Sequence, residues 1–212
     1  MSDEENIRPN TKTTKKAWLQ AAQRMLIKDG IGRVKVDRIA QSLHVTRGGF
    51  YWFFKNRDDL LTEMLKDWSD PENDFLTSVL TDNQLAPIDR LYQYVCVLLL
   101  EKDFNPALDQ AMRSWGQVDV KARKVVSEVD NRRICALVNI FKSLGEDAHS
   151  ALIRARIYYF HQIGYYVINQ RDNPSERLKL LPLYFKQLTG HELAEKVLDD
   201  IKQHEPYRSE CN

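Results

Sequence analysis

The 212-residue sequence contains little glycine and proline, few cysteines and no long apolar run. Its eight glycines and seven prolines together fall below the roughly 12% of average proteins, which favours helices over turn-rich β-structure. The three cysteines, Cys96, Cys135 and Cys211, form no Cys-x-x-Cys pair and indicate neither a disulfide framework nor a zinc site. The longest apolar run, Tyr94 to Leu100, is far shorter than the about 20 residues of a transmembrane helix, and residues 1–10 do not resemble a signal peptide. We therefore expect a soluble, cytoplasmic protein with no membrane partner.

The sequence also lacks the motifs of common enzyme active sites. It contains no glycine-rich dinucleotide loop, no Walker phosphate loop and no His-Glu-x-x-His sequence, and its five histidines are scattered. Glu146 and His149 have the spacing of half a di-iron motif, but such a site needs two such pairs and further carboxylates. We therefore expect no catalytic activity, no metal and no other cofactor.

Charge is distributed unevenly along the chain, although the net charge is only +1. Residues 12–57 contain eleven basic and two acidic residues, whereas residues 58–212 contain nineteen basic and twenty-five acidic ones. A basic block joined to an acidic remainder is typical of a protein in which one end contacts a polyanion. The charge pattern therefore predicts that the N-terminal part binds nucleic acid.

The spacing of apolar residues predicts four helices in the first third of the chain. The first two cover Thr14 to Asp29 and Val36 to Leu43, the third covers Arg47 to Phe54, and the fourth begins after Asn56 and reaches Trp68. Gly48 and Gly49 weaken the third helix by roughly 1 kcal/mol each relative to alanine, so tertiary packing must hold it. The fourth helix is expected to begin with Asn56 as its cap.

Six or seven further helices are expected beyond residue 70. Asn173, Pro174 and Glu176 supply a cap, a first-turn proline and a capping-box acid in order. Signals for strands and hairpins are absent, so the predicted fold class is all-α. The predicted division is a basic N-terminal domain at residues 12–57 and a larger helical domain at 58–204, with tails at 1–11 and 205–212.

The second and third helices have the arrangement of a helix-turn-helix motif. They are separated by a turn of about three residues, and Thr46 offers a hydroxyl to cap the third helix. In such motifs the later helix enters the major groove. Arg47 lies in its first turn, where a guanidinium reaches guanine O6 and N7. Gly48 and Gly49 leave the backbone without bulk, so that its amides can approach a phosphate.

The remaining side chains of this segment divide between DNA contact and core. Tyr51, Trp52, Lys55 and Arg57 are suited to phosphate contact. Phe50 and Phe54, four residues apart, are expected to pack the third helix onto the first.

Three segments of this region, Ala21 to Gly30, Val36 to Ala40 and Val45 to Leu61, resemble the N-terminal DNA-binding domain of TetR-family transcriptional regulators. The resemblance implies an all-helical bacterial homodimer, most often a repressor, whose first three helices bind a palindromic operator. It also implies that the remaining helices hold a small, largely apolar effector that releases the DNA. By position, the resemblance places six residues at the DNA face: Thr46, Arg47, Gly48, Tyr51, Trp52 and Phe53. It places Arg57 at the phosphate-binding start of the fourth helix.

Two positions depart from the family pattern. Val36 stands where a threonine often begins the second helix, so a hydroxyl contact to phosphate is lost or is replaced by a contact from the preceding Lys35. Phe53 stands where histidine is frequent, so a polar contact becomes apolar and suits a thymine methyl group. The operator sequence of relatives is therefore not expected to carry over.

The C-terminal helices supply candidates for an effector pocket and a dimer interface. A ligand site in a helical bundle is mostly apolar with a few polar groups. Residues of this kind that are expected to converge are Met64, Trp68, Tyr92, Cys96, Met112, Trp115, Phe160 and His161. The segment 147–169 is apolar around most of a helical circumference and needs partners on both sides. The resemblance makes this segment and residues 173–189 a four-helix dimer interface, with Ala151, Ala155, Tyr159, Gln162, Tyr166, Leu181 and Tyr184 as its candidate residues.

Two other functions compatible with DNA binding stay open at this point. Cys96 or Cys135 would sense an oxidant in place of a ligand, although neither has a flanking base to lower its pKa. Alternatively, the protein would be an architectural DNA-binding protein that responds to no effector.

Overall fold

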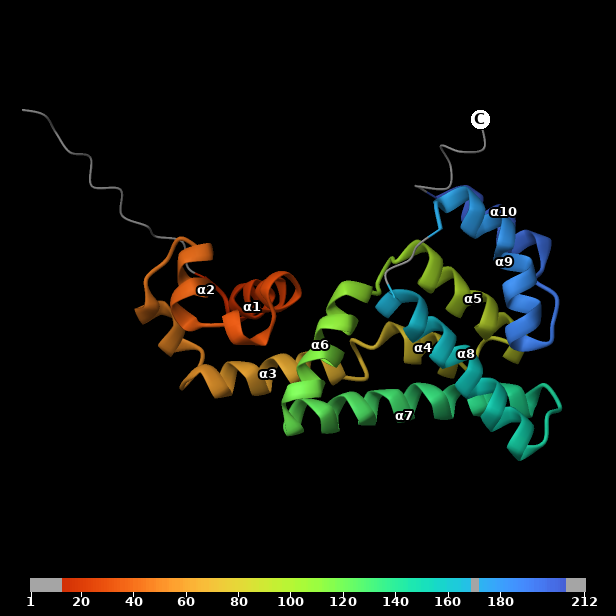
Figure 1. Ribbon diagram of the computed structural model, residues 1–212, viewed down its shortest axis with the longest axis horizontal. Helices are drawn as coiled ribbons and strands as arrows, with labels where there is room; N and C mark the ends of the chain where they lie inside the picture. Colours follow the sequence, from red (N-terminus) through yellow and green to blue (C-terminus); the bar gives the residue numbers. More distant parts are fainter. Residues whose placement is uncertain (1–12, 169–171, 205–212) are drawn as a thin grey trace, which may run out of the picture. The chain divides into compact units, whose positions relative to one another are not determined.

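The structure, a computed structural model, describes residues 13–168 and 172–204, and every regular element within them is helical. The predicted all-α class is therefore confirmed (Figure 1). The predicted tails lie outside the described residues. Among the described helices, none is long and apolar enough to cross a membrane.

The chain divides into two compact units, and the division differs from the predicted boundary after residue 57. The first unit contains the described residues up to Trp68 together with Ala107–Arg123, and the second contains Ser69–Pro106 and the described residues from Lys124 onward. Periodicity along the sequence gives no sign that a segment 40 residues downstream joins the N-terminal helices, because that packing is decided by non-local contacts.

The first unit consists of short helices around an aromatic core. Its elements are α1 (Lys15–Asp29), η1 (Ile31–Arg33), α2 (Val36–Ser42), η2 (Arg47–Trp52), α3 (Arg57–Ser69) and α6 (Pro106–Val118). Gly30 ends α1 with a φ of 76°, a left-handed conformation that favours glycine. Its N–H donates to Leu26 O at a distance of 3.0 Å. Asn56 caps α3, since its Oδ1 accepts from Asp59 N at 2.9 Å, as expected.

The third predicted helix is a 3₁₀-helix rather than an α-helix. The segment η2 covers Arg47–Trp52, and the Thr46 hydroxyl makes no capping hydrogen bond. Instead the Thr46 carbonyl accepts from Gly49 N at 3.2 Å. The predicted cap is therefore wrong, because a tight 3₁₀ turn at two adjacent glycines satisfies these groups through the backbone.

The aromatic core of the first unit fixes η2 as the sequence predicted. Phe50 and Phe54 are almost fully buried, and their rings stack with centroids 5.1 Å apart. The Phe50 ring also meets Trp18 of α1 edge-to-face at 5.5 Å. The core roles predicted for Phe50 and Phe54 are thus confirmed.

The second unit is a helical bundle. It contains α4 (Phe75–Thr81), α5 (Pro87–Leu100), most of α7 (Val120–Ser143), α8 (Ala148–Ile168), α9 (Pro174–Thr189) and α10 (Glu195–Lys202). Helices α4 and α10 pack on α5, and α8 packs on α9. Asn173 caps α9 by accepting from Glu176 N at 2.9 Å, as predicted. Seven α-helices follow residue 70 in the described chain, within the predicted number.

Candidate nucleic-acid interface and effector cavity

The segment η2 has one buried and one exposed side. Phe50 is fully buried, whereas the neighbouring Tyr51 and Trp52 are 56% and 86% exposed. Such a high exposure is unusual for the large, mostly apolar side chain of Trp52. Because an indole combines an apolar ring with an N–H donor, it is well suited to contact a binding partner. The core therefore holds η2 in place while its outer side remains available.

Arg47 lies at the start of η2 and is exposed. Its Nε lies 2.7 Å from Asp37 Oδ1 on α2, and a hydrogen bond with Tyr51, followed by the attraction of Asp37, raises the pKa of Arg47. The guanidinium is therefore held in a defined direction at the surface. Asp37 and Tyr51 were not expected from the sequence to orient this side chain, although Asp37 is one of only two acids in the basic block.

The two glycines of η2 face different surroundings. Neither has a positive φ. A Cβ added at Gly48 would meet only the Thr46 hydroxyl, at 3.7 Å, while one added at Gly49 would lie 3.7 Å from the Trp18 ring. Both are ordinary contact distances, so the fold of the first unit itself tolerates alanine at either position. Gly48 is exposed and Gly49 is partly buried, as expected if only Gly48 lies on the outer side.

Arg57 has a role inside the first unit that the sequence did not reveal. Its Nε donates to Val34 O at 2.6 Å and its Nη2 donates to Ile31 O at 2.9 Å. These bonds tie the start of α3 to the η1 segment, so the guanidinium does not extend freely into solvent. Of the other predicted DNA contacts, Lys35, Thr46 and Lys55 are exposed and Phe53 is partly buried.

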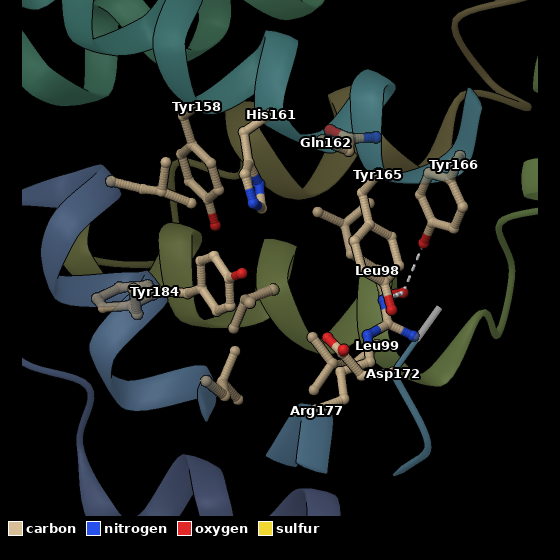
Figure 2. A pocket seen from close by; sticks show the side chains of 14 residues that line it. Leu98, Leu99, Tyr158, His161, Gln162, Tyr165, Tyr166, Asp172, Arg177 and Tyr184 are labelled. Atoms are coloured by element: carbon tan, nitrogen blue, oxygen red, sulfur yellow. Dashed lines mark hydrogen bonds between the residues drawn. The ribbon is translucent and has the colours of Figure 1, made fainter. Parts of the chain in front are cut away.

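A cavity of about 80 Å³ lies in the second unit between α5, α8 and α9. Tyr158, His161, Gln162 and Tyr165 reach it from one face of α8, and Tyr184 reaches it from α9 (Figure 2). The remaining lining residues are Val95, Leu98, Leu99, Tyr166, Asp172, Arg177, Leu181, Phe185 and Leu188. Positions 158, 161, 162 and 165 recur at helical spacing, a signal in the sequence that would have identified this polar stripe.

The eight residues predicted to converge on an effector do not line this cavity together. Only His161 lines the cavity, and burial lowers its pKa. Phe160 points to the surface, since it is 58% exposed. The others contribute to core packing or lie partly buried in one of the two units: Met64, Trp68, Met112 and Trp115 in the first, and Tyr92 and Cys96 in the second. Periodicity identified them as inward-facing but did not distinguish a cavity from a filled core.

The two described cysteines differ in exposure, with Cys96 half-buried and Cys135 exposed. Burial, with a smaller contribution from Asp200, raises the pKa of Cys96 to about 11. Because the thiolate is the reactive form, this environment disfavours oxidation of Cys96 at neutral pH. Cys211 lies outside the described residues.

Most residues predicted for the dimer interface are buried within the single chain. Ala151, Ala155, Tyr159, Gln162, Tyr166 and Leu181 are all 5% exposed or less, so their side chains do not form a surface, and only Tyr184 is exposed. This assignment is therefore corrected. The exposed apolar face lies on the other side of α8, with a further part on α9: Ile153, Ile157, Phe160, Val167, Leu183 and Tyr184. A helix that is apolar around most of its circumference cannot be oriented from periodicity alone.

Comparisons with known proteins agree with this architecture. Residues 19–64 match the family model of bacterial regulatory proteins, tetR family. The HTH-type transcriptional regulator SrpR of Pseudomonas putida is 24% identical over 166 residues, which cover 76% of this chain and 64% of SrpR. The probable HTH-type transcriptional regulator ArpR of the same species is 28% identical over 75 residues, 35% of this chain and 36% of ArpR. The chain thus spans less than two thirds of either relative.

The fold is also that of solved structures. A TetR-family transcriptional regulator from Marinobacter aquaeolei VT8 aligns with a TM-score of 0.66 at 15% identity, over 92% of this chain and 100% of that chain. The family match covers α1 through most of α3, the part of the first unit that contains the helix-turn-helix and its exposed Arg47, Tyr51 and Trp52. The segment that contains the helix-turn-helix thus belongs to the tetR family of bacterial regulatory proteins, and the fold of the whole chain is that of a solved TetR-family regulator.

Proposed function

We propose that the protein is a ligand-responsive repressor in the bacterial cytoplasm that binds a palindromic operator as a homodimer and is released by a small, largely apolar effector. The observation that carries the DNA-binding part is η2, in which Phe50 is buried against Trp18 while Tyr51 and Trp52 remain exposed. Eleven of the thirteen charged residues in the block 12–57 are basic, which favours contact with phosphates.

Each exposed side chain of this region has a proposed role at DNA. Arg47, oriented by Asp37, reads a guanine through O6 and N7. Thr46, Tyr51 and Trp52 contact the backbone and groove edge around it. The Gly48 amide approaches a phosphate, Phe53 meets a thymine methyl group, and Lys35 and Lys55 add contacts to phosphates.

The matched glycines give a direct test of the DNA face. We expect Gly48→Ala to weaken operator binding about tenfold or more, because a methyl group on the outer side blocks close approach of the backbone to phosphate. Gly49→Ala, whose methyl group points toward Trp18, is expected to bind almost as the wild type does. The operator is first selected from a random oligonucleotide pool with purified protein, and affinity is then measured by fluorescence anisotropy.

Two results would contradict the proposed interface. Selection that yields no enriched sequence would remove sequence-specific binding altogether. Equal losses of affinity for Gly48→Ala and Gly49→Ala would show that the outer side of η2 is not what meets DNA. The wild-type affinity should also fall steeply with salt, because binding to phosphates releases counterions.

The exposed apolar face of α8 and α9 is proposed to be the dimer interface. Residues 153, 157, 160 and 167 recur at helical spacing, and a continuous apolar stripe of this kind is typical of a surface that a second copy covers. A twofold axis would place the two η2 segments about 34 to 36 Å apart, one turn of DNA.

We expect Ile157→Asp to convert the dimer to a monomer, because a carboxylate would be desolvated in the centre of an apolar interface. Molar mass measured by light scattering after gel filtration reports the change, and affinity for a palindrome should fall with it. Val120→Asp, which alters a more exposed apolar side chain in the first unit, should remain dimeric. A wild-type protein that is monomeric at micromolar concentration, or an Ile157→Asp variant that stays dimeric, would contradict this interface.

The proposed response to effector is a shift between two populations of the dimer. Effector binding would favour an arrangement that tilts α3 and moves the two η2 segments away from a separation of one DNA turn. The cavity between α5, α8 and α9 is the proposed site of the effector, supported by its polar groups within an apolar wall.

A further inference from the structure

Three polar groups that line the cavity between α5, α8 and α9 have no hydrogen-bond partner among the described residues. They are Tyr158 Oη, Gln162 Nε2 and Tyr165 Oη, and each of these atoms is inaccessible to solvent. Tyr158 and Gln162 are each only 3% exposed as whole residues. A buried polar group without a partner is costly, and most such groups in folded proteins are satisfied. Three of them around one cavity therefore indicate a site that a bound molecule completes.

Neighbouring polar groups in the same region are satisfied within the chain. Tyr94 donates its hydroxyl hydrogen to Gln162 Oε1. Tyr166 donates its own to Leu98 O at 2.8 Å, the bond drawn as a dashed line in Figure 2. Because the bond from Tyr94 occupies the Gln162 amide oxygen, the group of this side chain that remains for a ligand is the NH₂ donor. The groups available to a ligand are thus one amide donor and two phenols, all of which can donate to an acceptor oxygen.

The wall of the cavity carries no uncompensated charge near these three groups. Arg177 donates to Leu98 O at 3.1 Å, lies 3.9 Å from Glu101 Oε1 and stacks over the Tyr165 ring at 4.9 Å. Asp172 lies close to Arg177, away from Tyr158 (Figure 2). Burial lowers the pKa of His161, so its imidazole is neutral at neutral pH. An anionic ligand would therefore lose its hydration without gaining an available cation.

We infer that this cavity binds an uncharged aromatic molecule with a carbonyl oxygen, which accepts a hydrogen bond from the Tyr158 phenol. The apolar side chains of Leu98, Leu181 and Phe185 cover the aromatic ring. The chemical class of the ligand is inferred from these lining groups. Only the identification of this molecule as the effector rests on the proposed function. The volume of about 80 Å³ limits the ligand to a small molecule with no more than one ring.

The test compares three single-ring probes that have the same number of non-hydrogen atoms: acetophenone, isopropylbenzene and benzoate. Dissociation constants are measured on the purified full chain by ligand-observed NMR, without DNA. We expect acetophenone to bind about tenfold more tightly than isopropylbenzene, which replaces the acceptor by a methyl group, and more tightly than the benzoate anion. Isopropylbenzene binding equally well would indicate a plain apolar cavity, tighter benzoate would indicate an anion site, and no binding by any probe would indicate that the cavity holds only water. Each of these results would overturn the inference.

Two tyrosine variants separate the ligand role from folding. Tyr158→Phe is expected to lower the affinity for acetophenone about fivefold and to leave the affinity for isopropylbenzene unchanged. Its melting temperature should equal or exceed that of the wild type, because the substitution removes no hydrogen bond within the described residues. Tyr159→Phe is the matched control: it removes the bond from Tyr159 Oη to Asp130 Oδ1 at 2.7 Å, outside the cavity. It should lower the melting temperature and leave acetophenone affinity unchanged. A lower melting temperature in Tyr158→Phe, or an unchanged acetophenone affinity, would contradict the assignment.

The outcome is distinguishable from failure of the proposed function. If acetophenone binds as expected but does not release the operator, the ligand class stands and the role as effector falls. If the protein selects no DNA sequence while the probes bind in the expected order, the proposed function fails and the cavity assignment is unaffected.

Discussion

Replacing Phe50 by alanine is expected to lower the free energy of unfolding of the first unit by about 3–5 kcal/mol and to abolish operator binding. Phe50 is fully buried and its ring contacts both Trp18 and Phe54, so truncation leaves a cavity between α1 and η2. Since whole domains are stable by only about 5–15 kcal/mol, a loss of this size removes much of what fixes η2. Tryptophan fluorescence during urea denaturation measures the effect, because all four tryptophans of the chain belong to the first unit.

The control is the exposed neighbour on the same segment. Trp52→Ala removes a side chain that is 86% exposed, so the free energy of unfolding should change by no more than about 0.5 kcal/mol while DNA affinity falls. The two variants thus lose DNA binding for different reasons, one through the fold and the other through the contact. A Phe50→Ala protein that unfolds at the wild-type urea concentration would show that η2 is not held by this core.

Local sequence signals predicted the starts of α3 and α9 and the aromatic core correctly. Asn56 and Asn173 cap their helices through short-range bonds to the residue three positions on, and such bonds depend only on nearby sequence. Phe50 and Phe54 were assigned to the core from their four-residue spacing, and both are buried although Phe54 lies beyond the end of η2. Where the controlling interaction is local, the sequence was therefore sufficient.

Predictions that depended on packing between distant segments were less successful. The buried side of α8 could not be chosen from the sequence, because Tyr159 and Phe160 are adjacent aromatic residues and only the first is buried. The cavity was missed for the same reason: Gln162 was assigned to the dimer interface, and the sequence does not show that Tyr158 and Gln162 each have a buried polar atom without a partner among the described residues. Likewise Arg57 was assigned to phosphate, whereas the fold directs it to the carbonyls of Val34 and Ile31.

The second large effect is expected from Asp74→Ala, which should destabilise the second unit by about 3–5 kcal/mol. Asp74 is 3% exposed, its Oδ1 lies 3.0 Å from Arg133 Nη2, and its Oδ2 accepts from Thr77 at 2.6 Å and from Arg132 Nη2 at 3.0 Å. Removing the carboxylate deprives the buried Arg133 guanidinium of this counter-charge and α4 of its cap. Because no tryptophan lies in this unit, its unfolding appears in far-UV circular dichroism without a change in tryptophan fluorescence.

An exposed ion pair in the same unit provides the control. Asp199 lies 3.1 Å from Lys202 Nζ at the surface, and Asp199→Ala should cost no more than about 1 kcal/mol, since solvent screens such pairs. If Asp74→Ala and Asp199→Ala lower the free energy of unfolding equally, the buried carboxylate of Asp74 stabilises the fold no more than an exposed ion pair does.

The effect of Asp74 should also depend on pH. Burial alone would raise the pKa of Asp74, but the attraction of Arg133 and the hydrogen bonds from Thr77, Arg133 and Arg132 outweigh it, so the pKa lies below its usual value. A carboxylate whose folded pKa is depressed stabilises the protein above its unfolded pKa of about 3.9, and this contribution disappears as the pH falls through the folded pKa. The difference in unfolding free energy between the wild type and Asp74→Asn should therefore be larger at pH 7 than at pH 3. A difference that is the same at both pH values would show that the charge of Asp74, as distinct from its hydrogen bonds, contributes nothing to stability.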